Sequence, residues 1–391
     1  MRDDESSRRP PIARLRAPCD GPAMRLRSLA AALALVSCRL APNAHATADA
    51  AATGARLYSQ YCALCHGAGG QGYAADNAPS LVSSTFRATA SDAFLRAAIE
   101  RGRPGTAMGG YGASVGGPLG PVEVDAVMLF LREGSPAPTA LPQTPLAGNA
   151  AAGKAVYDAS CAGCHGTQWQ RQSAVHLANP AFLASASDAF LAEAIRRGRP
   201  GTPMKAWSAL YTDTTVNDVV AYVRSMATPV SPPGMPPGWQ PGMPPPGPEP
   251  APPLPGAIVL NPEGKSPEFT LKDDRFLPPE QLAAALEKKQ RVVVIDARPP
   301  SDFNRLHIPG ALPIPYYDLK NLEHVPDDGT WVVAYCACPH HASGVVVDEL
   351  RKRGYKHTAV LDDGIFAWQH AGRPVVEAPG QLPTAAPPLL R

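Results

Sequence analysis

The sequence predicts a multidomain chain in which two all-α domains are followed by an α/β domain with a parallel sheet. Three observations predict this order. A segment near the N-terminus recurs roughly 97 residues further along the chain. A proline-rich block follows the second copy, and strand-like and helix-like segments alternate beyond it. The 391 residues are enough for two or three domains, each with a core of its own.

Composition excludes some classes of partner. The net charge is +2, so we expect neither nucleic acid nor an anionic membrane surface to be bound. The eight cysteines do not form the scattered framework of a small disulfide-stapled domain. Two lie near the start, Cys19 and Cys38, and the others form local pairs: Cys62 with Cys65, Cys161 with Cys164, and Cys336 with Cys338.

Residues 1–46 are interpreted as an export region with its start at Met24. Two arginines precede the apolar run Ser28–Cys38, which is too short to span a bilayer and has the length of a secretory h-region. Ala44 and Ala46 form an A-x-A cleavage site, so a periplasmic location is expected. Two alternatives stay open: "LVSC" resembles a lipoprotein box that would anchor Cys38 to a lipid, or the region is a buried helix of a cytosolic protein.

The repeat defines two homologous domains, 50–134 and 149–228, joined by a linker at 135–148. "GARLYSQYCALCHGAGG" (54–70) recurs as "GKAVYDASCAGCHGTQW" (153–169). "ASDAFLRAAIERGRPGTAMGGY" (90–111) recurs as "ASDAFLAEAIRRGRPGTPMKAW" (186–207). Each copy ends in an amphipathic helix pattern, so a duplicated helical domain is expected rather than a solenoid.

A proline-rich linker, 229–259, separates the repeat from the third unit. Fourteen of the 27 residues 229–255 are proline, which favours an extended spacer over helix or sheet. The third unit, 260–378, precedes a tail at 379–391. Its strand-like runs are "RVVVIDAR", "WVVAYCAC" and "HTAVLDDG", and its helix-like segments are "PPEQLAAALEKK" and "ASGVVVDELRKRG". Their alternation predicts a parallel sheet flanked by helices.

Both helical copies carry the C-x-x-C-H signature for covalent attachment of c-type haem. "CALCH" places Cys62 and Cys65 before His66, and "CAGCH" places Cys161 and Cys164 before His165. Two thiols three residues apart on a helical turn reach the two vinyl groups, and the adjacent histidine lies under the iron. We therefore expect two covalently attached haem c groups.

Met108 and Met204 are the candidate sixth ligands. Both follow "RGRPGT" at the same position of the repeat, in a Gly/Pro-rich loop without helical periodicity. His176 is a rival in the second copy. The copies resemble small class I cytochromes c, including an N-terminal helix with Gly54/Tyr58 or Gly153/Tyr157 and a C-terminal helix with Phe130 or Tyr222. His/Met ligation leaves no open position at iron, so one-electron transfer is expected.

The third unit resembles single-domain rhodaneses over about 110 residues. The matching stretches are 292–315, with Asp296, Arg298, Asp302 and "HIPGA", then "WVVAYCACPHHAS" (331–343) and 360–375, with Gly364 and Trp368. The resemblance implies that Cys336 takes a sulfane sulfur as a persulfide and yields it to a thiophilic acceptor. It also implies a six-residue loop, 337–342, whose N–H groups stabilise the sulfur together with the following helix.

Two further residues of this loop receive roles. Cys338 is a candidate resolving thiol that could attack a persulfide on Cys336. His341 is expected to support the loop, since it stands where the family often has arginine. The alternatives are a dithiol/disulfide redox pair, a degenerate loop in a partner-docking module, and a metal site built from Cys336, Cys338, His340 and His341.

Together these features predict a periplasmic dihaem electron carrier with a sulfur-handling domain. Its expected partners are periplasmic redox proteins and a small sulfur compound such as thiosulfate or a persulfide. Sulfurtransferase or sulfur-oxidising activity is the enzymatic expectation.

Overall fold

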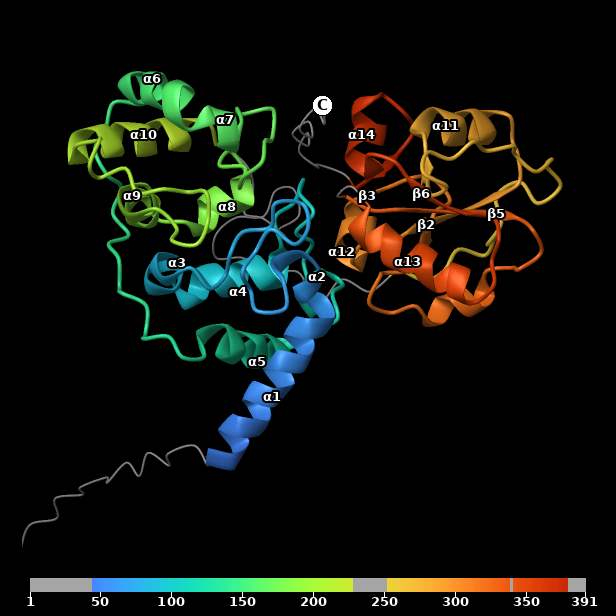
Figure 1. Ribbon diagram of the computed structural model, residues 1–391, viewed down its shortest axis with the longest axis horizontal. Helices are drawn as coiled ribbons and strands as arrows, with labels where there is room; N and C mark the ends of the chain where they lie inside the picture. The colour runs from blue at the N-terminus through green and yellow to red at the C-terminus, as the bar shows by residue number, and fades with distance from the viewer. Residues whose placement is uncertain (1–43, 228–251, 338–339, 379–391) are drawn as a thin grey trace, which may run out of the picture. The chain divides into compact units, whose positions relative to one another are not determined.

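A computed structural model describes residues 44–227, 252–337 and 340–378 (Figure 1). The predicted export signal, Cys38, most of the proline-rich linker, Cys338 and the tail lie outside these residues. No helix within the described ranges is both long and apolar enough to cross a membrane. The fold class is confirmed: helices occupy the described chain up to residue 225, and an α/β domain follows.

The first copy of the repeat folds into short helices around one long N-terminal helix. These are α1 (Ala44–Tyr61), α2 (Ala63–His66), α3 (Ser84–Thr89), α4 (Asp92–Arg101), the 3-10 helix η1 (Ala113–Val115) and α5 (Pro121–Arg132). Local signals set several limits. The Ser91 hydroxyl caps α4 by accepting the N–H of Phe94, and Gly102 ends α4 with a positive φ of 67°. Pro121 occupies the first turn of α5.

The second copy repeats this order. Its helices are α6 (Ala150–Ser160), α7 (Ala162–His165), α8 (Pro180–Ser185), α9 (Asp188–Arg197) and α10 (Asp213–Ser225). Ser187 caps α9 as Ser91 caps α4, and Asn149 and Thr212 cap α6 and α10. The domain limits inferred from the repeat stay predictions.

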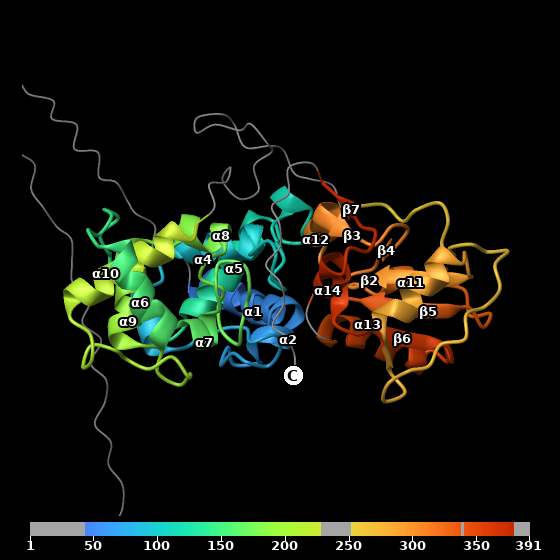
Figure 2. The same cartoon turned by 90° about the horizontal axis from the view of Figure 1, so that it is seen from above.

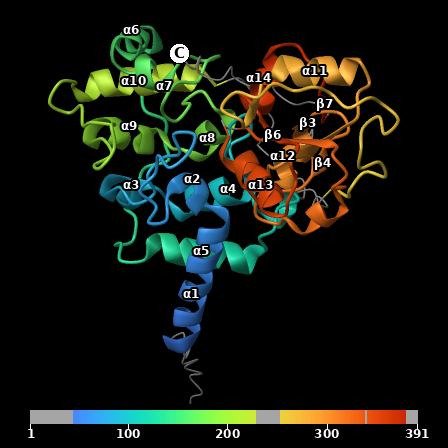
Figure 3. The ribbon, with the colours of Figure 1, turned by 45° about the vertical axis from the view of Figure 1, so that its right-hand side comes forward.

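In each copy the first and last helices cross closely at a glycine (Figure 3). A Cβ on Gly54 would lie 2.0 Å from the Ala126 carbonyl oxygen, and one on Gly153 would lie 1.9 Å from that of Asp218. Aromatic rings support both crossings: Tyr58 packs on Phe130 at 4.8 Å and Tyr157 on Tyr222 at 5.2 Å between ring centroids. The glycine and aromatic positions singled out in the sequence thus form the helix crossing.

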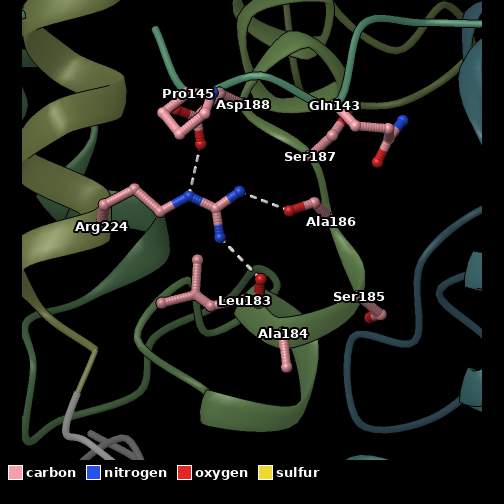
Figure 4. Close-up of a pocket in the computed structure, with 9 residues that line it drawn as sticks. All are labelled: Gln143, Pro145, Leu183, Ala184, Ser185, Ala186, Ser187, Asp188 and Arg224. Atoms are coloured by element: carbon pink, nitrogen blue, oxygen red, sulfur yellow. Dashed lines mark hydrogen bonds and ion pairs between the residues drawn. The ribbon is translucent and has the colours of Figure 1, made fainter. Parts of the chain in front are cut away.

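In each copy an arginine on the last helix binds the connection between two earlier helices. This connection joins α3 to α4 in the first copy and α8 to α9 in the second. Arg224 donates to Asp188 Oδ1 at 2.5 Å, to the Leu183 carbonyl at 2.6 Å and to the Ala186 carbonyl (Figure 4). Arg132 makes the equivalent contacts in the first copy, to Asp92 at 2.9 Å and to two carbonyls. The hollow lined by Gln143, Pro145 and 183–188 is thus bordered by an arginine whose three guanidinium nitrogens each donate a hydrogen bond.

One hydrophobic cluster runs through both copies. At its centre four phenylalanine rings meet edge to face or tilted, with centroids 4.9–6.4 Å apart: Phe86, Phe94, Phe182 and Phe190. The guanidinium group of Arg103 lies over two of these rings, one from each copy, and that of Arg199 lies over the other two. The repeated domains therefore share a core instead of burying two separate ones.

The α/β domain is built on a parallel sheet with strand order β1-β6-β5-β2-β4 (Figure 2). The strands are β1 (Phe276–Leu277), β2 (Val292–Asp296), β4 (Leu312–Pro313), β5 (Trp331–Tyr335) and β6 (Thr358–Leu361). A small antiparallel pair joins β3 (Leu306–His307) to β7 (Val376–Glu377). The helices are α11 (Pro279–Glu287), α12 (Pro300–Arg305), η2 (Lys320–His324), α13 (His341–Lys352) and α14 (Gly364–His370).

Asp296 and Arg298, two residues of the rhodanese resemblance, form a buried ion pair at the end of β2. Asp296 accepts from Arg298 Nη2 at 2.6 Å, and Arg298 also reaches the Leu306 carbonyl. Burial opposes the charge of Arg298, but the Asp296 carboxylate outweighs it and raises the pKa of Arg298. The pair fixes the turn that leads from β2 into α12.

Candidate functional site

The two C-x-x-C-H segments have the same local geometry. In the first, the backbone N–H of His66 donates to the Cys62 carbonyl at 3.0 Å. In the second, the backbone N–H of His165 donates to the Cys161 carbonyl at 2.9 Å. The hydroxyls of Tyr58 and Tyr157 donate to the carbonyls of the glycines that follow each histidine, at 2.8 and 2.9 Å. Each pair of cysteines therefore lies on one helical turn with its histidine, as attachment of a haem requires.

Both histidine rings are oriented by a backbone carbonyl. Nδ1 of His66 lies 2.9 Å from the Pro79 oxygen, and Nδ1 of His165 lies 2.8 Å from the Val175 oxygen. Because a carbonyl only accepts, Nδ1 carries the proton in each ring and Nε2 keeps its lone pair for a metal. Burial lowers the pKa of both histidines, which favours the neutral imidazole that binds iron.

Three of the four thiols are not activated nucleophiles before attachment. Burial raises the pKa of Cys62 and of Cys65 to about 12 and that of Cys161 to about 11. The nearby Asp76 carboxylate and Cys336 add to the shift at Cys65.

The predicted methionine ligands occupy matching loops. The backbone N–H of Arg103 donates to the Met108 carbonyl at 2.7 Å, and the backbone N–H of Arg199 donates to the Met204 carbonyl at 2.7 Å. Thr106 and Thr202 each accept the N–H of the methionine two residues later at 3.1 Å. The loops are thus held in one conformation by identical hydrogen bonds, while iron ligation by the methionines stays a prediction.

The side chains of Arg103 and Arg199 are buried cations that could pair with an anionic group of a cofactor. Burial lowers the pKa of each to about 10. Nη2 of Arg103 is buried and has no hydrogen-bond partner among the described residues. A buried cationic nitrogen in that state fits a haem propionate, so the residues present fit haem c in the first copy.

His176, the rival ligand, is engaged elsewhere. It is buried, and its Nε2 lies 2.9 Å from the Thr167 carbonyl oxygen, so this nitrogen donates a hydrogen bond. Its ring therefore supports the loop after the second C-x-x-C-H segment.

Cys336 lies where the rhodanese resemblance predicts it, directly after β5 and ahead of α13. Its side chain is 2% exposed, and its Sγ lies 3.3 Å from the hydroxyl of the buried Ser343. The carbonyl of Cys336 accepts the N–H of Ile365 on α14, which fixes the strand end. The Ser343 hydroxyl can donate to this sulfur when it is a thiolate, and the N-terminal end of the 12-residue helix α13 also favours negative charge there.

The loop length predicted as 337–342 is wrong, because α13 already begins at His341. His340 has a positive φ of 77°, and its carbonyl accepts the N–H of Gly344 at 2.8 Å. This left-handed residue completes the turn early enough for the helix to start at His341. His341 therefore lies in the first turn of the helix, and its support of the loop stays a prediction.

Sequence reasoning gave His340 no role of its own, yet the structure pairs it with Asp362. Its Nε2 lies 2.6 Å from Asp362 Oδ1, and its ring packs on Phe276 at 4.0 Å between centroids. Asp362 directly follows β6, and Phe276 belongs to β1. The loop beside Cys336 is thus tied to two neighbouring strands through His340.

Among the described residues no group of three or more His, Cys, Asp or Glu side chains is placed to hold an ion. The metal alternative also needs Cys338, so it stays untested. Cys338 lies outside the described residues, so its role as a resolving thiol stays a prediction.

These features define a chain of two c-type cytochrome units and an α/β unit with a cysteine at a strand end. Residues 49–131 and 148–223 match the family described as cytochrome c oxidase, cbb3-type, subunit III. Residues 278–371 match the rhodanese-like domain family. The chain therefore contains cbb3-type cytochrome c domains in two regions and a C-terminal rhodanese-like domain. The cytochrome match implies covalently bound haem c and supports electron transfer.

Among curated proteins, the chain is similar to the Cbb3-type cytochrome c oxidase subunit CcoP of Azospirillum sp. (strain B510). It is 32% identical over 197 residues, which cover 45% of this chain and 62% of that protein. The CcoP of Azospirillum brasilense is 31% identical over 201 residues, covering 47% and 64%. The chain thus spans less than two thirds of the length of these relatives.

Among solved structures, the chain is similar to the rhodanese-like domain of an Anabaena sp. protein. The two are 25% identical, and the match covers 27% of this chain and 84% of that domain, with a TM-score of 0.25.

Proposed function

We propose that this chain is an exported dihaem electron carrier whose rhodanese-like domain holds sulfane sulfur as a persulfide on Cys336. Cys62 and Cys65 would attach the first haem and Cys161 and Cys164 the second. The axial ligands would be His66 with Met108 and His165 with Met204.

The histidine geometry carries the electron-transfer part of the proposal. Both C-x-x-C-H histidines donate Nδ1–H to a carbonyl within 2.9 Å, which leaves Nε2 available on each ring. Haem c supplies one-electron transfer when bound. A methionine on the opposite side would leave the iron no open position, so the proposed role is transfer and not substrate turnover at iron.

The surroundings of Cys336 support the sulfur part. With thiosulfate as donor, the thiolate attacks the outer sulfur, the S–S bond breaks, and sulfite leaves while the persulfide forms. A thiophilic acceptor then takes the outer sulfur and restores the thiolate. Ser343 and the start of α13 would stabilise the anionic sulfur in both states.

A thiosulfate:cyanide sulfurtransferase assay tests this part. We expect turnover in the wild type and its loss in Cys336→Ser, whereas equal rates would refute the persulfide role. Coupling to the haems is tested with a persulfide donor, which should reduce them faster in the wild type than in Cys336→Ser. Mass spectrometry of the whole protein counts the haems and detects a lipid on Cys38 or a disulfide with Cys338.

A second candidate is an electron carrier whose rhodanese-like domain only docks a partner. The 2% exposure of Cys336 favours it, because a donor has little access to a buried side chain. It predicts no turnover that depends on Cys336. A dithiol/disulfide or metal site with Cys338 is the further alternative, and it requires a disulfide or a non-haem metal that is lost in Cys338→Ser.

We place the protein in the periplasm, with redox proteins as partners. Two of its relatives are subunits of a cbb3-type oxidase, so a terminal oxidase is the class of electron acceptor that we propose to test first.

A further inference from the structure

The rhodanese-like domain contacts the loop that carries Met108. Ser301, on α12, lies against Gly110, and both residues are buried. The Ser301 hydroxyl accepts the Gly110 N–H at 3.1 Å and donates to the Gly110 carbonyl at 2.8 Å. One side chain thus satisfies both backbone groups of a residue two positions after the proposed iron ligand, and water has little access to either group.

A tyrosine makes the second polar contact. The Tyr316 hydroxyl donates to the Tyr61 carbonyl at 2.7 Å and lies 3.1 Å from the Tyr111 hydroxyl. Tyr317 adds an edge-on contact with the Tyr61 ring at 4.8 Å between centroids. Tyr61 immediately precedes the first haem-attaching cysteine. The contact therefore reaches both the start of the C-x-x-C-H turn and the end of the methionine loop.

Close backbone approach makes this contact specific for the first copy. A Cβ on Gly109 would lie 2.8 Å from Asp302 Oδ2 and 2.9 Å from Pro299 Cγ, so a larger residue would force the surfaces apart. The repeat places Lys205 at the position of Gly109 and Ala206 at that of Gly110. Lys205 is exposed, with its ammonium 4.6 Å from the centre of the Trp207 ring. The second methionine loop thus lacks the shape that the first one presents.

We propose that Ser301 and Tyr316 bind the first methionine loop (102–111) and hold Met108 in place as the ligand of the first haem, whereas the described residues give Met204 no equivalent support. We call Gly109, Gly110, Tyr111, Ser301 and Tyr316 the seam. Ser301 and Tyr316 are positioning residues, since they act through the loop. The inference rests on the proposed ligation by Met108, and it holds whether or not Cys336 transfers sulfur.

Imidazole binding to the oxidised full-length protein tests the seam, because imidazole replaces a methionine ligand when the loop moves away. Met108→Ala and Met204→Ala first assign the spectral change of each haem. Ser301→Ala removes both hydrogen bonds to Gly110, and Tyr316→Phe removes those to Tyr61 and Tyr111. We expect imidazole to bind the first haem about tenfold more tightly in Ser301→Ala, which corresponds to about 1.4 kcal/mol, and the second haem as in the wild type.

A loop exchange provides the matched control. The double variant Gly109→Lys/Gly110→Ala gives the first loop the residues of the second, and it should raise imidazole affinity at the first haem at least as much as Ser301→Ala. The reverse exchange, Lys205→Gly/Ala206→Gly, changes a loop that the seam does not include. It should leave the first haem unchanged.

The outcomes separate the seam from the function on which it rests. Unchanged imidazole affinity in both Ser301→Ala and Tyr316→Phe, with Met108→Ala behaving as a ligand variant, overturns the seam alone. Equal effects on both haems also overturn it, since they indicate general loosening of the fold. If Met108→Ala leaves the first haem unaltered, the ligand assignment fails, and the role given to the seam fails with it.

Discussion

Replacing Arg224 by alanine should destabilise the second cytochrome domain more than the equivalent change destabilises the first. Arg224 donates to Asp188 and to two backbone carbonyls that connect α8 with α9. The Asp188 side chain is 10% exposed, whereas that of Asp92, the partner of Arg132, is 67% exposed. Loss of the cation therefore leaves a nearly buried carboxylate in one copy and a hydrated one in the other.

The magnitudes follow from that difference. Two lost hydrogen bonds to neutral carbonyls cost about 1–2 kcal/mol in either copy. An exposed ion pair adds about 0–1 kcal/mol, so Arg132→Ala should cost about 1–3 kcal/mol in total. In Arg224→Ala the unpaired buried carboxylate adds a cost of about 1–2 kcal/mol. The cost is no larger because Asp188 still accepts a hydrogen bond from the Leu146 N–H at 2.8 Å. We expect about 2–4 kcal/mol there.

Native-state hydrogen exchange measured by mass spectrometry is the suitable assay, because it reports the opening free energy of α5 and α10 separately in the same molecule. Arg224→Ala should speed exchange in α10 by a factor of about 30 or more, and Arg132→Ala should act on α5 less strongly. Equal effects in the two variants, or a larger effect in Arg132→Ala, would refute the reasoning from carboxylate burial.

Three more predictions test other features. Gly153→Ala should destabilise the α6–α10 crossing by about 2 kcal/mol or more, since its Cβ would lie 1.9 Å from a carbonyl oxygen, whereas Gly163→Ala, with open space, should be neutral in thermal unfolding. Burial raises the pKa of Asp302, so its contribution to stability is present below the unfolded pKa of about 3.9 and is lost as pH rises through the folded value. Asp302→Asn should therefore gain stability over the wild type between pH 4 and pH 7 in denaturant titrations, and a constant difference would contradict this. His340→Gln should increase proteolysis or alkylation at the loop beside Cys336 without unfolding the sheet, and unchanged labelling would argue against the His340–Asp362 tie.

Local pattern was sufficient to predict much of the fold. The repeat gave two helical copies, and the alternation after the proline-rich block gave the parallel sheet, because burial periodicity and turn residues act over short distances. Gly54 and Tyr58 could be placed in the first helix for the same reason. The haem-attachment segments were visible since their ligands are adjacent in sequence.

Contacts between distant residues could not be derived in the same way. The pairing of His340 with Asp362 spans 22 residues, and that of Ser301 with Gly110 spans 191. Neither partner has a residue type or spacing that marks it. The early start of α13 depends on the left-handed His340, which is a conformation that histidine adopts under tertiary constraint. A comparison of the two repeat copies held one usable signal: "GGY" at 109–111 against "KAW" at 205–207.

That difference has a consequence for how the duplicated domains divide their work. A redox partner from outside must approach a haem edge directly, and the seam occupies the end of the first methionine loop. The corresponding part of the second loop presents the exposed Lys205, a cation suited to an acidic docking surface. The seam would thus direct the first centre toward the rhodanese-like domain and leave the second centre to partners from outside.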